Sequence, residues 1–106
     1  MVETDNPQVA ASARREFRHL PPEAREAFLR AFPLLAHNPE RATDDLDVER
    51  LRDRSTGQFT QYWRLKVPGV EYRAIYVVRH GIAYVEAFRL RPGVYPWIAK
   101  VYGHSR

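Results

Sequence analysis

Hydrophobic residues recur at helical spacing through the first part of the chain. One apolar stripe is formed by residues three or four positions apart: Val9, Ala13, Phe17 and Leu20. The pair Asn6-Pro7 suits the start of this helix, with asparagine as the N-cap and proline in the first turn. We therefore predict a helix from this pair to about His19.

A second helix follows at once. Pro21-Pro22-Glu23 ends the first helix and begins the next. Its buried face is predicted at Ala24, Ala27, Phe28, Ala31 and Leu35. Proline lacks a backbone donor, so Pro33 predicts a kink or a restarted turn within the helix. Asn38-Pro39 ends it, and two short antiparallel helices result.

The segment from residue 39 to residue 58 is polar and rich in charge. Its only apolar anchors are Leu46, Val48 and Leu51. The acidic run Asp44–Glu49 is interpreted as a solvated loop, and Ser55-Thr56-Gly57 as a turn.

After residue 58 the hydrophobic period changes to that of β-strands. Three strands are predicted, at Phe59–Val67, Glu71–Arg79 and Ile82–Arg91. Pro68-Gly69 and His80-Gly81 separate them as turns. Residues 94–102 are compatible with a last strand or a short helix. The predicted class is α+β, with an N-terminal helical hairpin packed on a small antiparallel β-sheet.

Length and composition restrict the class of protein. The 106 residues fit one domain, with residues 1–6 as a short strand or a flexible tail and residues 103–106 as a C-terminal tail. No apolar run is long enough for a transmembrane helix, and MVETDNPQ has no apolar core of a secretory signal. The chain has no cysteine, which excludes a disulfide framework and a thiol nucleophile. We expect a cytoplasmic protein without membrane contact.

Charge divides the chain into two unlike parts. Residues 1–60 hold nine Lys+Arg and eleven Asp+Glu, whereas residues 61–106 hold eight and two. The second part also carries nine of the 13 aromatic residues. Cations neutralise phosphates and aromatic faces stack on bases, so this combination suits a nucleic acid. It is equally compatible with an ordinary basic sheet surface.

The second part also contains a recognisable set of motifs. Residues 60–95 read TQYWRLKVPGVEYRAIYVVRHGIAYVEAFRLRPGVY, with a Y-R-x-I-Y strand, a hairpin and R-x-R-x-x-x-Y. Upstream stand F-R-x-L-P-x-E-A-R-E, then N-P and L-R. In this order they resemble the RelE/ParE superfamily of bacterial toxins, over about residues 9–96. The family usually opens with a β-strand, of which MVETDNPQ offers at most a stub.

The resemblance implies a function and partners. Members of the RelE branch have a RelE-like microbial RNase fold and are toxins of toxin–antitoxin systems that cut mRNA in the ribosomal A site. The expected partners are therefore a cognate antitoxin protein, mRNA and the ribosome. The expected enzyme is an endoribonuclease that uses no metal and no cofactor.

The family's active site, a basic cluster with a tyrosine, carries over to particular positions here. The expected catalytic residues are Arg64, Lys66, Arg73, Arg89 and Tyr95. The expected RNA-binding residues are Tyr62, Trp63 and Arg91. Each also has a structural interpretation, as a solvated strand charge for the basic residues and as a core aromatic for the others.

Cleavage without metal defines what these residues would do. The RNA 2′-hydroxyl attacks the adjacent phosphate, which requires a base, charge stabilisation and protonation of the 5′-oxygen. Arg73 and Arg89 suit the phosphate, because a planar guanidinium matches its oxygens and stays charged. Tyr95 is the candidate base. The resemblance nominates Arg89 as the acid, although Lys66 gives up a proton more readily than an arginine.

Two other functions share the same fold. In the ParE branch the toxin inhibits DNA gyrase and cuts nothing, and a non-catalytic RNA-binding homologue could keep the basic surface. Fold does not separate these possibilities, because one scaffold hosts all of them. The full set of basic residues with the tyrosine favours the nuclease.

Overall fold

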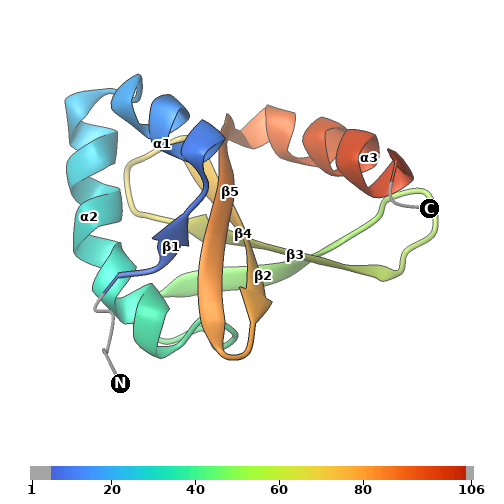
Figure 1. Ribbon diagram of the computed structural model, residues 1–106, viewed down its shortest axis with the longest axis horizontal. Helices are drawn as coiled ribbons and strands as arrows, with labels where there is room; N and C mark the ends of the chain where they lie inside the picture. The colour runs from blue at the N-terminus through green and yellow to red at the C-terminus, as the bar shows by residue number, and fades with distance from the viewer. Residues whose placement is uncertain (1–5, 105–106) are drawn as a thin grey trace.

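A computed structural model describes the chain from residue 6 to residue 104, with side chains through residue 102. A five-stranded sheet in the order β1-β5-β4-β3-β2 lies between two helical layers. Helices α1 and α2 cover one face and α3 covers the other (Figure 1). The elements are β1 Gln8–Val9, α1 Ala11–Arg18, α2 Pro22–His37, β2 Asp47–Arg52, β3 Phe59–Lys66, β4 Tyr72–Arg79, β5 Ile82–Leu90, the 3₁₀-helix η1 Arg91–Gly93 and α3 Val94–His104.

The larger core lies between the sheet and helices α1 and α2. Phenylalanines from both layers meet there, with the rings of Phe28 and Phe88 5.2 Å apart and those of Phe17 and Phe88 5.6 Å apart. Leu35 and Leu65 are fully buried beside them. This packing confirms the predicted helical hairpin on a sheet.

A smaller core lies under α3. Val94 and Ile98 form its helical side, and Ile75 and Val77 of β4 form its floor. The spacing of the apolar positions fits a helix, because Val94, Ile98 and Val101 face one core at intervals of four and three residues, which a strand would place on opposite faces. Of the two alternatives for residues 94–102, the helix is therefore the correct one. Strand β4 is covered on both faces, and its side chains from Arg73 to Val77 are all buried.

The N-terminal prediction is wrong between residues 6 and 10. Gln8 and Val9 form β1, which pairs in parallel with Tyr84 and Val85 of β5, and α1 begins only at Ala11. The Ala10 amide also donates to the Val85 carbonyl, at 2.9 Å. An unpaired strand edge exposes backbone donors and acceptors, so pairing with β5 prevails over the local helix-start signal.

The acidic run is a strand from Asp47 onward, which corrects the predicted loop. Strand β2 pairs antiparallel with β3, and the register is irregular between Arg50 and Arg52. Val48 enters the larger core and Leu51 the smaller one, because strand residues three apart project to opposite faces of the sheet. The sequence did not indicate this strand because most of its residues are charged. They can be, since β2 lies at an edge of the sheet, where outward side chains face solvent.

Smaller differences concern where elements end. Helix α2 runs unbroken through Pro33, so the expected restart is wrong; the buried neighbours Phe32 and Leu35 hold the helix across it. Strands β3 to β5 match the predicted ones to within one residue at each end. Residues 103 and 104 belong to α3 rather than to a tail. The expectations for residues 1–5 and 105–106 lie outside the described residues.

The turns and helices agree with the sequence in other respects. His80 and Gly81, with φ of 53° and 77°, form the turn between β4 and β5 as predicted.

Within residues 6–104 no helix is long and apolar enough to cross a membrane.

Candidate active site

A cavity of about 800 Å³ opens on the α3 side of the sheet. Five of its described lining residues are cationic and one is a carboxylate. The whole lining comprises Glu49, Leu51, Arg54, Arg64, Lys66, Arg73, Arg91, Pro92, Val94, Tyr95 and Pro96. It combines strong positive charge with a tyrosine, which are the groups expected of a phosphate-binding site.

Strand register explains why these cations share one wall. Lys66 of β3 lies opposite Arg73 of β4, and antiparallel partners project to the same face. Arg64 is two residues before Lys66 and so shares that face. Arg91 follows the end of β5, whose Arg89 is the register partner of Arg73. The cavity thus lies where β3 ends and β4 begins.

Arg73 is the most enclosed of the cavity cations. Only 8% of the residue is exposed, and its Nη1 donates to the Val70 carbonyl at 3.0 Å and the Tyr72 carbonyl at 3.3 Å. Burial first, and then the charges of Arg64 and Arg91, lower the pKa of Arg73. An anion in the cavity would relieve this repulsion, so Arg73 is placed to bind one.

Arg64 differs from Arg73 because acidic side chains of β2 balance its charge. Its Nη1 lies 2.8 Å from Asp47 Oδ1, and its Nη2 lies 3.8 Å from Glu49 Oε2. Its side chain is 18% exposed, compared with 53% for Asp47. Arg64 therefore contributes less free positive charge to the cavity than its position alone suggests.

Tyr95, in the first turn of α3, is covered by an arginine that the sequence did not single out. The Arg54 guanidinium carbon lies 3.8 Å from the centre of the Tyr95 ring. Arg54 follows β2 in a stretch with several other arginines, and no local pattern separates it from them. The contact arises only because the β2–β3 loop folds toward α3.

Arg89 is the expected catalytic residue that the structure places elsewhere. Its side chain turns round the edge of β5 to α1, where Nη1 donates to Glu16 Oε2 at 2.7 Å and to the Phe88 carbonyl at 2.8 Å. It does not line the cavity.

The expected stacking residues also lie outside the cavity. Tyr62 is only 9% exposed and packs edge-to-face on Trp97, with ring centres 5.1 Å apart. Trp63 points to the opposite face of the sheet, stacked on Tyr76 with centres 6.3 Å apart. The cavity therefore gathers Arg64, Lys66, Arg73, Arg91 and Tyr95, but not Arg89, Tyr62 or Trp63.

The part of the chain that the structure describes adds no metal site to this cavity. Among those residues no group of three or more histidine, aspartate or glutamate side chains could hold a metal ion. The side chains that line the cavity can bind phosphate through guanidinium groups, and they include a phenol and an ammonium group.

Comparison with known proteins places this α+β architecture in a known fold. The sequence matches no family model and no curated protein. In structure it is similar to the RelB–RelE antitoxin–toxin complex of Methanococcus jannaschii, with a TM-score of 0.59, 17% identity, and coverage of 85% of this chain and 96% of the other.

A second similar structure is the archaeal RelE–RelB complex of Pyrococcus horikoshii. The TM-score is 0.60 at 21% identity, over 79% of this chain and 91% of the other. The chain therefore has a RelE-like fold, which confirms the fold expected from the sequence motifs.

Proposed function

We propose that this protein is the toxin of a toxin–antitoxin system and an endoribonuclease that cuts mRNA in the ribosomal A site. The observation that carries the proposal is the cationic cavity, which is lined by a buried arginine, four further cations and a tyrosine. The RelE-like fold supports the same assignment. A cognate antitoxin is part of it, because both similar structures are RelE–RelB complexes.

The reaction we propose needs no metal ion. The 2′-oxygen of the RNA attacks the neighbouring phosphorus, the bond from phosphorus to the 5′-oxygen breaks, and a 2′,3′-cyclic phosphate remains. Arg73 and Arg91 bind the phosphate oxygens and stabilise the charge that grows on them in the transition state. Arg73 is suited to this because its backbone contacts fix its guanidinium in advance.

Two side chains are assigned to the protons. Tyr95 takes the proton of the 2′-hydroxyl, and Lys66 donates one to the departing 5′-oxygen. Both line the cavity that Arg73 lines, and Lys66 is the register partner of Arg73. The proposal gives Arg89 no reacting role, because its guanidinium is bound to Glu16 outside the cavity.

Primer extension on mRNA incubated with the purified protein tests the proposal, with and without programmed ribosomes. We expect cuts within A-site codons only when ribosomes are present. Folded protein that stops growth but cuts RNA under neither condition would contradict the nuclease and favour inhibition of DNA gyrase.

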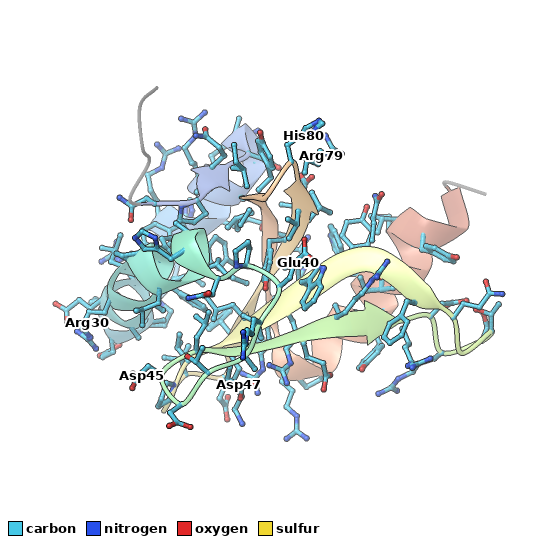
Figure 2. The ribbon with its side chains drawn as sticks, turned by 90° about the horizontal axis from the view of Figure 1, so that it is seen from below. Arg30, Glu40, Asp45, Asp47, Arg79 and His80 are labelled. Carbon is cyan, nitrogen blue, oxygen red and sulfur yellow. The ribbon has the colours of Figure 1, made fainter. Side chains whose placement is uncertain are left out.

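Variants of one strand connect cleavage to the cavity. Arg73→Ala removes the anchored guanidinium and should abolish cleavage, while Arg73→Lys keeps a charge in case the alanine variant does not fold. Arg79→Ala is the matched control, because Arg79 lies at the other end of β4. Figure 2 shows it beside His80, on the far side of the molecule from Asp47. Equal cleavage by the folded Arg73 and Arg79 variants would overturn the site.

A further inference from the structure

The β2–β3 loop has a defined shape that depends on Asp53. Asp53 is 6% exposed, and its Oδ2 accepts from the hydroxyls of Ser55 at 2.8 Å and Thr56 at 3.0 Å. Its backbone closes the loop through bonds to Gln58 and Gly57, at 2.8 and 2.7 Å. These hydrogen bonds therefore fix the backbone position of the residue that follows Asp53.

That residue is Arg54, and it projects into the cavity from the side opposite most of the other cations. Asp47, at the start of β2, pairs with Lys66 and so marks the end where Arg64, Lys66 and Arg73 gather. Arg54 follows the other end of β2. Figures 1 and 2 both show the loop on the α3 side of the sheet.

Positive charge therefore lies at both ends of the cavity, with Tyr95 in contact with Arg54. A single phosphate held by Arg73 cannot also satisfy a cation at the far end. A nucleic acid strand with successive phosphates can, because it carries a charge at every nucleotide. The arrangement thus fits a short stretch of single-stranded RNA rather than an isolated anion.

We propose that Arg54 is a further RNA-binding residue of this site, which binds a phosphate next to the scissile one and positions the Tyr95 ring. The inference depends on the function proposed above. A guanidinium is suited to both tasks, since it stacks on an aromatic face while its edge donates to phosphate oxygens. Arg54 acts on the reaction through Tyr95 and the bound strand, not as an acid or base.

The chain supplies a matched control in Arg52. Its guanidinium carbon also lies 3.8 Å from the centre of an aromatic ring, that of Phe59, and its Nη1 donates to the Gly57 carbonyl at 2.7 Å. Arg52 is exposed like Arg54 but does not line the cavity. A general effect of losing one arginine near this loop would appear equally in both variants.

Binding of fluorescent 2′-O-methyl oligonucleotides, which cannot be cut, tests the contact at several salt concentrations. Arg54→Ala should bind a tetranucleotide about tenfold more weakly and reduce the slope of log K against log salt by about 0.7, the value for one phosphate contact on a single strand. A dinucleotide, with one phosphate, should bind Arg54→Ala and the wild type alike. Arg54→Lys should restore the slope, and Arg52→Ala should match the wild type.

Cleavage on programmed ribosomes tests the positioning of Tyr95. Arg54→Lys keeps the charge but loses the planar contact with the ring, so we expect a lower kcat at an unchanged KM. Equal binding of the tetranucleotide by Arg54→Ala and Arg52→Ala would overturn the inference. Failure of the wild type to bind the tetranucleotide would overturn it as well. A wild type that binds as expected but never cuts would contradict the proposed nuclease instead.

Discussion

At the scale of single residues, the Tyr95 hydroxyl separates chemistry from stacking. Tyr95→Phe keeps the ring that Arg54 covers and removes only the group proposed to take the 2′-hydroxyl proton. A positioned base contributes about 10²- to 10⁴-fold, so cleavage should fall by that factor while RNA binding stays unchanged. Single-turnover cleavage on programmed ribosomes measures this. Tyr84→Phe, outside the cavity, is the control, and cleavage by Tyr95→Phe at the wild-type rate would make Tyr95 a stacking residue only.

Strand periodicity predicts part of this site and misses the rest for a physical reason. Alternation along β3 places Arg64 and Lys66 on one face, and the sequence shows that directly; the register that adds Arg73 to this face comes from the structure. Arg89 has the right register but leaves the site for Glu16, a partner 73 residues earlier in the chain. Arg54 enters through a loop contact. Long side chains reach partners that no local pattern specifies.

At the scale of elements, Glu16 joins α1 to the part of β5 that β1 leaves unpaired. Its Oε1 accepts from the Phe88 amide at 2.9 Å and its Oε2 binds Arg89 at 2.7 Å. Glu16→Gln removes the negative charge. The new side-chain NH₂ group then faces either the Phe88 amide or the Arg89 guanidinium, both of which are donors. Because both charged side chains are about one-third exposed, we expect a loss of about 1 to 2 kcal/mol in the free energy of unfolding.

Urea denaturation measures this loss, with Glu26→Gln on the exposed face of α2 as the control. The control removes the same charge from a helix without an interaction across to the sheet. If both variants lose the same free energy of unfolding, Glu16 does not stabilise the edge of β5.

Tyr76 joins β4 to the segment after α2. Its fully buried hydroxyl donates to the Pro39 carbonyl at 2.6 Å. Tyr76→Phe should reduce the free energy of unfolding at pH 7 by about 1 to 2 kcal/mol, since the carbonyl loses its partner. Urea denaturation of both proteins at pH 7 measures this loss. Repeating it at several pH values tests a second consequence of the buried hydroxyl.

Burial raises the pKa of Tyr76 above its ordinary value of 10.0. The folded protein thus keeps this proton at pH values where the unfolded chain releases it. The resulting stability is present below about pH 10 and is lost as the pH rises toward the folded-state pKa. The difference in the free energy of unfolding between wild type and Tyr76→Phe should therefore become smaller above about pH 10. A difference that stays constant up to about pH 11 would contradict a buried, protonated Tyr76.

The elements that the sequence predicts are those whose own periodicity is strong. Helices α1 and α2 and strands β3 to β5 have clear apolar patterns, and each is found close to its predicted place. Strand β1 has only two residues, too few for any period, and β2 is an edge strand with mostly charged outward positions. Both depend on a neighbouring strand that lies far away in sequence, so only tertiary pairing defines them.

At the scale of the whole molecule, the uneven distribution of charge becomes a prediction about salt. Residues 61–106 carry a net charge of +6, and they supply Lys66, Arg73 and Arg91 to the cavity, while Arg54 comes from the first part. The Asp47 carboxylate neutralises the charge of Arg64, so these four cations remain available to bind RNA. If each of the four forms one ion pair with the phosphate oxygens of a single strand, the slope of log K against log salt should be about −3.

Titrating the protein with a fluorescent 2′-O-methyl oligonucleotide at salt concentrations from about 50 to 200 mM measures this slope. Arg30→Ala, on α2, removes one cation from the first part of the chain without touching the cavity. Figure 2 shows Arg30 at the edge of the helical layer. It should leave the slope unchanged, whereas Arg91→Ala should reduce it by about 0.7. A reduction of equal size in both variants would mean that RNA responds to the net charge of the protein and not to the cations gathered in this cavity.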